Sequence, residues 1–179
     1  MKRLTLLRHA KSGEDGTVAR DFDRPLNAKG RRAARAIGRH MRDHALRFDV
    51  VLASPATRVA ETLQEVEAVY GLGLSPVWEK RLYLATPDEL LDAVHEAPAG
   101  AESLLLVGHN PGLEQLVLRL VPHRVDGARS EVEAKYPTAS LAEMIFPVER
   151  WEDVGDGGGD LVRFVRPRDL DPELGPDYI

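Results

Sequence analysis

Short apolar runs alternate with longer amphipathic segments along most of this chain. The runs at 3–8, 49–53 and 103–108 are too short for helices and lack the polar alternation of a half-exposed strand, so they predict buried parallel strands. The segments between these runs repeat apolar positions at helical spacing. Alternating strands and helices are typical of a three-layer α/β/α sandwich with a mainly parallel sheet. The pattern therefore predicts this α/β fold class.

Capping residues mark the expected helix starts. Serine, threonine and asparagine side chains accept hydrogen bonds from the free N–H groups of a first helical turn, and proline is favoured at the first helical position. Such residues, three of them followed by proline, precede four amphipathic segments. The expected helices are 28–46 after Asn27, 55–70 after Ser54, 87–96 after Thr86 and 111–121 after Asn110.

The last third of the chain lacks this alternation. Residues 122–136 show little periodicity and predict a loop. Residues 139–146 and 161–165 predict two strands, which we expect to form a hairpin at the sheet edge. The tail from Pro167 is rich in proline and aspartate and is expected to lie loosely on the surface. We therefore expect one domain over residues 1–168 and a C-terminal tail over 169–179.

Composition narrows the classes of partner. The chain has 179 residues, and its 43% hydrophobic content is ordinary for a folded domain. A net charge of −5 argues against nucleic acid as a partner, and the absence of cysteine excludes thiol catalysis and disulfides. No apolar stretch is long enough for a membrane helix, and the start lacks a signal-peptide pattern. We expect a cytoplasmic protein with no membrane partner; nothing in the pattern indicates its oligomeric state.

Two histidines follow predicted strands. Arg8-His9 ends the first strand, and Gly108-His109 ends a strand one hundred residues later. The carboxyl ends of parallel strands face one crevice, so both imidazoles are expected there, and Arg58 in the first turn of the helix after Ser54 is expected beside them. Guanidinium groups and imidazoles suit a phosphoryl group. The alternative is structural: strand-end histidines bonded to carbonyls, and Arg8 and Arg58 in ion pairs with Asp21, Asp23 or Glu61.

Several segments carry a resemblance to a known family. Leu7-Arg8-His9-Ala10-Lys11-Ser12, Ser54-Pro55-Ala56-Thr57-Arg58 with Thr62, and Val107-Gly108-His109-Asn110 resemble, in order and spacing, the signature of the phosphoglycerate mutase-like histidine phosphatase superfamily. The segment 21–27 with Gly30, and the segment 162–167, are similar to its small phosphohistidine phosphatase branch, SixA. The resemblance covers about residues 3–168.

This resemblance implies a phosphatase that needs no metal or other cofactor. His9 would attack phosphorus and form a phosphohistidine, which water then hydrolyses. Arg8, Arg58 and a protonated His109 would hold the phosphoryl group, and a backbone carbonyl would bind the second nitrogen of His9. The preferred substrate is a protein that carries phosphohistidine. The alternatives are a broad phosphomonoesterase for small phosphate esters and a non-catalytic module that binds phosphate or phosphoprotein.

The general acid is the least defined part of the site. Ester-cleaving members of the superfamily protonate the leaving oxygen with a carboxylic acid between the segments of Arg58 and the second histidine. Glu79 is the first candidate, followed by Asp88 or Glu89, which could instead serve as favourable charges in a first helical turn. The SixA-like branch manages without such an acid. Trp78 and Tyr83 are expected to be packing residues.

Overall fold

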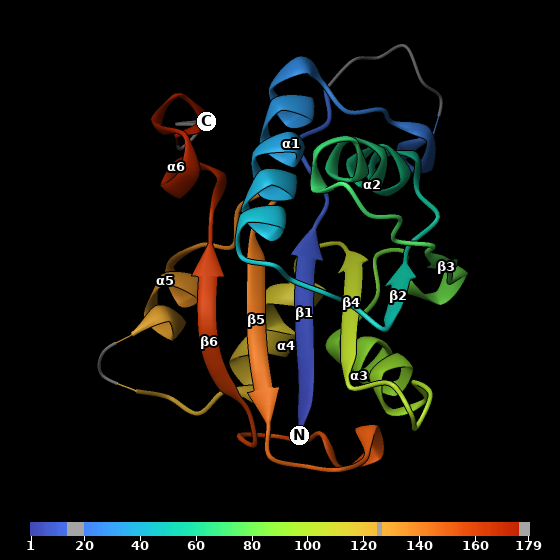
Figure 1. The fold of residues 1–179 in the computed structure, drawn as a ribbon, viewed down its shortest axis with the longest axis vertical. Helices are drawn as coiled ribbons and strands as arrows, with labels where there is room; N and C mark the ends of the chain where they lie inside the picture. Colours follow the sequence, from blue (N-terminus) through green and yellow to red (C-terminus); the bar gives the residue numbers. More distant parts are fainter. Residues whose placement is uncertain (14–19, 125–126, 176–179) are drawn as a thin grey trace.

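The computed structural model describes residues 1–13, 20–124 and 127–175. One sheet contains six strands in the order β3-β2-β4-β1-β5-β6 (Figure 1). The strands are β1 Lys2–Arg8, β2 Val50–Ala53, β3 Val77–Trp78, β4 Ser103–Gly108, β5 Leu141–Phe146 and β6 Asp160–Val165. Strands β3, β2, β4 and β1 run parallel, whereas β5 and β6 are antiparallel to their neighbours. The mainly parallel sheet and its antiparallel edge hairpin are thus confirmed.

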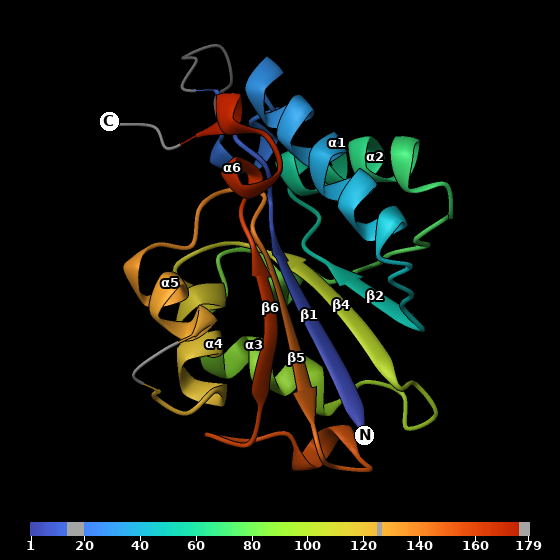
Figure 2. The same cartoon turned by 60° about the vertical axis from the view of Figure 1, so that its left-hand side comes forward.

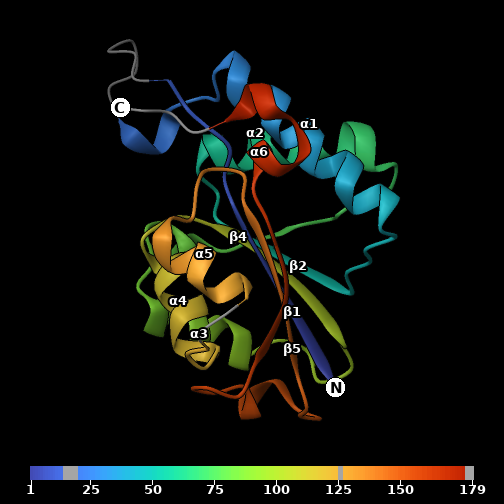
Figure 3. The same ribbon diagram turned by 90° about the vertical axis from the view of Figure 1, so that its left-hand side faces the viewer.

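Helices cover both faces of the sheet. Helices α1 and α2 lie on one face, and α3, α4 and α5 lie on the other (Figures 2 and 3). Their bounds are α1 Ala28–Asp43, α2 Thr57–Tyr70, α3 Pro87–His95, α4 Gly112–Leu120 and α5 Ala128–Ala134. Alternate residues of β4 enter opposite cores, since Leu104 and Leu106 pack toward α3 and α4 while Leu105 and Val107 pack toward α1 and α2. The three-layer α/β/α fold is confirmed, and no helix in the described ranges is long and apolar enough to cross a bilayer.

The register of β1 and β4 places the two histidines together. These strands are paired in parallel with Arg8 opposite Gly108. The next residue of each strand is a histidine, and the His9 N–H donates to the Gly108 carbonyl at 3.1 Å. His9 and His109 therefore leave the sheet as neighbours at its carboxyl edge, as the strand pattern predicts.

A glycine allows α1 to approach the loop that follows β1. The Asn27 side chain caps α1 as predicted, accepting from the Gly30 N–H at 2.8 Å, and the Asn27 N–H donates to the Lys11 carbonyl at 3.0 Å. A Cβ atom on Gly30 would lie 2.1 Å from the Lys11 oxygen, which no side chain tolerates. Glycine at this position therefore lets the helix hold the loop beside the strand ends.

The predicted cap of α2 is wrong, and the predicted start of α4 is shifted by one residue. Helix α2 begins at Thr57 without a side-chain cap, and Ser54 Oγ instead lies 2.8 Å from His109 Nε2. Helix α4 begins at Gly112 after a cis Asn110–Pro111 peptide bond, although Asn110 Oδ1 still accepts from the Glu114 N–H at 3.2 Å. In both segments the predicted capping residue lies in the site at the strand ends, a tertiary role that a local pattern does not reveal.

Two predictions for the last third are also wrong. The segment expected as a loop contains α5, where Val132 is the one buried residue, so the helix leaves no apolar periodicity. The tail does not lie loosely over 167–175: α6 (Pro167–Leu170) forms, Leu174 is buried, and Arg32 pairs with Asp171 and Glu173 at 2.6 Å each. These ion pairs join distant parts of the chain, which tail composition does not reveal. Residues 176–179 of the predicted tail lie outside the described ranges.

Candidate active site

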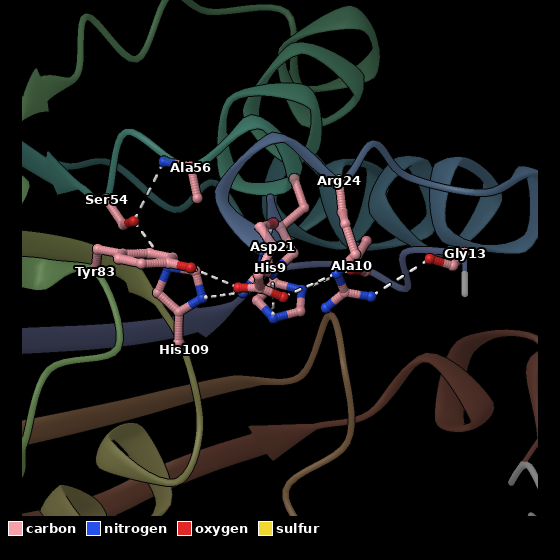
Figure 4. Close-up of polar contacts among 10 residues, drawn as sticks. His9, Ala10, Gly13, Asp21, Arg24, Ser54, Ala56, Tyr83 and His109 are labelled. Carbon is pink, nitrogen blue, oxygen red and sulfur yellow. Dashed lines mark hydrogen bonds and ion pairs between the residues drawn. The ribbon is translucent and has the colours of Figure 1, made fainter. Parts of the chain in front are cut away.

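A cavity of about 440 Å³ lies at the carboxyl ends of the parallel strands, and we call it the histidine pocket. The rings of His9 and His109 are 5.2 Å apart between centroids, and Figure 4 shows them facing Asp21. The Arg58 guanidinium contacts both rings, with Nε 3.4 Å from His9 Nε2 and Nη2 3.3 Å from His109 Nδ1. The lining residues are Arg8, His9, Lys11, Ser12, Asp21, Arg24, Arg58, Leu84, His109, Asn110 and Thr138.

His9 has its lone pair directed into this pocket. Its Nδ1 atom lies 2.7 Å from the Ala10 carbonyl, which only accepts, so Nδ1 carries the proton and donates. Its Nε2 atom is then unprotonated and accepts from Arg58 Nε. Burial lowers the pKa of His9 to about 3, with further lowering by the charge of Arg8. The imidazole is therefore neutral near pH 7, and Nε2 is a competent nucleophile.

His109 is held in the opposite tautomer. Its Nδ1 atom accepts from Arg58 Nη2, since a guanidinium has no lone pair to offer, and its Nε2–H donates to Ser54 Oγ at 2.8 Å. Burial and the nearby charge of Arg58 lower the pKa of His109 to about 4. His109 is therefore neutral near pH 7 in this arrangement, because it is buried beside the Arg58 cation. Its protonation when it holds a phosphoryl group stays a prediction.

Thr62 ties the loop after His9 to helix α2. Its hydroxyl accepts from the Ala10 N–H at 2.9 Å and donates to the Arg58 carbonyl at 2.6 Å, and the side chain is fully buried. The bridge joins the residue after His9 to the first turn of α2. The relative position of His9 and Arg58 is therefore fixed by a hydrogen-bonded threonine at the core of the site.

Arg8 reaches the pocket from the end of β1. Its Nη1 group donates to the Tyr136 carbonyl at 2.8 Å, and the Asn110 side-chain amide donates to the same oxygen at 2.9 Å. The buried Arg8 Nε finds no hydrogen-bond partner in the described part of the chain. One end of the guanidinium is thus anchored to the backbone while the side chain still lines the pocket.

Asp21, Arg24 and Tyr83 form a rim of the histidine pocket, and the sequence pattern assigns none of them to the site. Asp21 accepts from Tyr83 Oη at 2.5 Å, from Arg58 Nη2 at 3.0 Å and from Arg24 Nε at 2.9 Å. These hydrogen bonds, that of Tyr83 first, lower the pKa of Asp21 to about 2. The Tyr83 ring meets the His109 ring edge-on at 5.3 Å, so its expected role as a packing residue is incomplete. The possible ion pair between Arg58 and Asp21 does form, but inside the site.

The structure does not bring the predicted acid candidates to the histidine pocket. The Glu79 N–H donates to the Ala53 carbonyl, whereas its carboxylate lies 3.7 Å from Arg81 Nε. Asp88 pairs with Arg119, and the Glu89 carboxylate accepts from the Thr86 N–H in the capping box of α3. The three carboxylates are therefore held by partners that do not line the histidine pocket. Asp21 is the carboxylate among the described residues that line the pocket.

The pocket as a whole suits an anion with several acceptor oxygens. Arg8, Lys11, Arg24 and Arg58 line it against the single carboxylate of Asp21. Guanidinium groups bind phosphate oxygens through paired, charge-assisted hydrogen bonds. Within the described ranges, no group of three or more histidine, cysteine, aspartate or glutamate side chains could hold a metal ion. The geometry thus combines a nucleophilic nitrogen with donors for the group it would attack.

Comparison with known proteins agrees with this geometry. The sequence profile of the histidine phosphatase superfamily (branch 1) matches residues 4–83. An uncharacterised protein of Mycobacterium tuberculosis is 34% identical over 164 residues, which cover 90% of this chain and 100% of that protein. The solved structure of a proposed phosphohistidine phosphatase SixA from Nakamurella multipartitia matches with a TM-score of 0.79 at 31% identity, over 93% of this chain and 96% of that one. Its counterpart from Agrobacterium tumefaciens gives 0.78 at 28% identity, over 93% and 98%. The chain therefore belongs to the histidine phosphatase superfamily and is a phosphatase.

Proposed function

We propose that this phosphatase removes the phosphoryl group from phosphohistidine on a protein, through a phosphohistidine intermediate on its own His9. The observation that carries the proposal is the neutral His9 imidazole, whose Nδ1–H is held by the Ala10 carbonyl while Nε2 faces the Arg58 guanidinium. The similarity to proteins described as SixA phosphohistidine phosphatases supports the substrate class.

The reaction proceeds in two displacements at phosphorus. In the first, the His9 Nε2 lone pair forms a bond to phosphorus, and the bond to the substrate nitrogen breaks with its electron pair going to the leaving imidazole. Arg8 and Arg58 stabilise the negative charge on the phosphoryl oxygens. In the second, the oxygen of water forms a bond to phosphorus and its proton passes to the solvent, while the bond to Nε2 breaks with its electron pair returning to His9, so that inorganic phosphate leaves. His9 returns to its neutral form.

The state of Asp21 favours phosphohistidine over a phosphate ester. An ester oxygen leaves poorly unless an acid protonates it, and Asp21 is ionised and paired with Arg58. The phosphorylated imidazole of the substrate can carry a proton on its other ring nitrogen near neutral pH, so it leaves as neutral imidazole without an acid from the enzyme. A pocket without a protonated carboxylic acid among its described lining residues therefore suits a phosphoramidate. Esters with a good leaving group, such as p-nitrophenyl phosphate, remain usable as laboratory substrates.

Phosphate release tests the proposal. Release is measured in EDTA from a phosphohistidine protein and from p-nitrophenyl phosphate, for wild type, His9→Ala and His123→Ala. His123 is an exposed histidine that contacts Arg129, so it controls for loss of an imidazole. We expect His9→Ala to lose at least ~10³-fold in activity on both substrates, as removal of a nucleophile does, and His123→Ala to retain it. Turnover that survives in His9→Ala would overturn the proposal.

A further inference from the structure

A second cavity of about 430 Å³ adjoins the histidine pocket, and we call it the basic pocket. It lies between the start of α1, the loop after β1, the chain that follows α5, and α6; Figure 3 shows α6 beside α1. Arg8, Lys11, Ser12 and Thr138 line both cavities. The two cavities are therefore adjacent, and a ligand that extends past these shared residues would contact both.

Positive charge is concentrated in the basic pocket. None of the described residues that line it is acidic, although the chain has a net charge of −5. Arg166 Nη2 forms an ion pair at 3.0 Å with Asp169, which does not line the pocket, so this carboxylate compensates part of the Arg166 charge. A cavity of one sign focuses its field and attracts the opposite charge. The basic lining residues are Arg8, Lys11, Lys29, Lys135, Arg166 and Arg168.

The shape indicates a small group rather than an extended polymer. Ala33, Pro167 and Leu174 are buried and line the pocket with apolar surface between the cations. Its volume falls within the range of about 300–1,000 Å³ that is usual for small-molecule sites. A nucleic-acid surface would spread its basic residues along a stripe, whereas these surround one hollow. The pocket therefore fits a single anionic group and the few atoms that carry it.

We propose that the basic pocket is a subsite for a second anionic group of the substrate, carried by the molecule whose phosphoryl group lies against His9. The proposal rests on the proposed function, because it takes the phosphoryl position from it. A phosphate or carboxylate there would accept charge-assisted hydrogen bonds from Arg168 and Lys135, while Arg8 stands between the two groups. Substrates with one anionic group would leave the subsite unused.

Non-hydrolysable inhibitors test the subsite. Propylphosphonate and alkane bisphosphonates of increasing length compete with p-nitrophenyl phosphate, and the ratio of the mono- to the bisphosphonate inhibition constant is measured for each variant. The ratio cancels changes in the histidine pocket, which both inhibitors share. We expect a ratio of at least about 10 for the best chain length in wild type, since a charged hydrogen bond contributes that much, and a ratio near 1 in Arg168→Ala/Lys135→Ala.

Arg39→Ala is the matched control. Arg39 is an exposed arginine on α1, about 15 Å along the helix from Lys29 at the usual rise per residue. We expect its ratio to equal that of wild type. A wild-type ratio near 1, or a ratio that survives in Arg168→Ala/Lys135→Ala, would overturn the subsite. Failure of the proposed function is seen separately, as turnover that persists in His9→Ala.

Two further substrates distinguish the source of the second anion. Phosphohistidine peptides that differ only in glutamate or glutamine beside the phosphohistidine are compared by kcat/KM. A preference for the glutamate peptide that disappears in Arg168→Ala/Lys135→Ala supports the subsite and identifies an acidic protein side chain. Equal rates for both peptides, together with the bisphosphonate ratio above, support the subsite and identify a second phosphate on a small molecule.

Discussion

The floor and the rim of the histidine pocket are built differently. The floor consists of His9, Ser54, Arg58 and His109, which are at most 7% exposed, and each is hydrogen-bonded to another member or to buried backbone. The rim consists of Asp21, Arg24 and Tyr83, which are more exposed and come from 3₁₀ turns or the residue just after one. The two meet at Arg58, which contacts both imidazoles and the Asp21 carboxylate. From this difference we propose that the floor performs the chemistry, whereas the rim controls how much of the Arg58 charge a substrate receives.

Replacement of Arg58 should have the largest effect on activity, because the floor and the rim of the pocket both depend on its guanidinium. We expect Arg58→Ala to lower kcat by ~10²–10³, the usual effect of removing a donor to transition-state charge. Arg58→Lys keeps the charge but loses the planar guanidinium, so its kcat should lie between those of wild type and Arg58→Ala. Burial lowers the pKa of His109 most and the Arg58 charge lowers it further, so this pKa should rise above about 4 in Arg58→Ala, as measured by NMR titration. An unchanged kcat in Arg58→Ala would contradict the role of the floor.

Replacement of Ser54 should affect the floor less than replacement of Arg58. Ser54→Ala removes the acceptor for His109 Nε2–H, a hydrogen bond worth about 1 kcal/mol, so kcat/KM should fall by roughly tenfold or less. The matched control is Ser140→Ala, since Ser140 Oγ is also buried but has no hydrogen-bond partner within the described residues. Equal losses of kcat/KM in the two variants, measured by steady-state kinetics, would show that the hydrogen bond between His109 and Ser54 does not contribute to catalysis.

Asp21 tests the rim. Its carboxylate competes with a phosphoryl group for Arg58, so Asp21→Asn, which keeps the shape and removes the charge, should lower KM a few-fold. The kcat for p-nitrophenyl phosphate should change little. A large fall in kcat with esters, without a fall for phosphohistidine, would instead identify Asp21 as a general acid and overturn its assignment to the rim.

Glu79 belongs to neither part, and its replacement should have the smallest effect. Its carboxylate pairs with Arg81 outside the histidine pocket. Glu79→Gln should therefore keep kcat/KM for p-nitrophenyl phosphate and for a phosphohistidine protein within about twofold of wild type, as for most surface changes. A selective loss with the ester would restore Glu79 as the acid that its sequence position suggests.

The places of His9, Arg58 and His109 in the floor could be predicted from sequence because their causes are local, whereas that of Ser54, which is predicted as a helix cap, could not. An apolar run ending in Arg8-His9 or Gly108-His109 predicts a strand and the residue at its end, and parallel pairing brings such ends together. The roles of Arg8, His9, Arg58 and His109 in catalysis stay predictions until the variants are measured.

The rim as a whole could not be predicted, since its contacts are long-range, although the ion pair of Asp21 with Arg58 is one of the alternatives that the sequence leaves open. Asp21 meets Tyr83 across 62 residues, and neither residue follows a strand or caps a helix in a recognisable pattern. The ordered tail could not be predicted for the same reason, since Arg32 binds Asp171 across 139 residues. The position of Glu79 between two motifs makes it a candidate general acid, but its ion pair with Arg81 holds its carboxylate outside the pocket.

The central claim is that His9 carries the phosphoryl group, and direct detection of the phosphoenzyme tests it. The protein is mixed with a phosphohistidine substrate, quenched in alkali, where phosphohistidine survives, and digested for mass spectrometry. The account predicts a phosphoryl group on the peptide that contains His9 in wild type and in His123→Ala, and none in His9→Ala. A phosphoryl group on another residue, or turnover by a protein that never becomes phosphorylated, would contradict it.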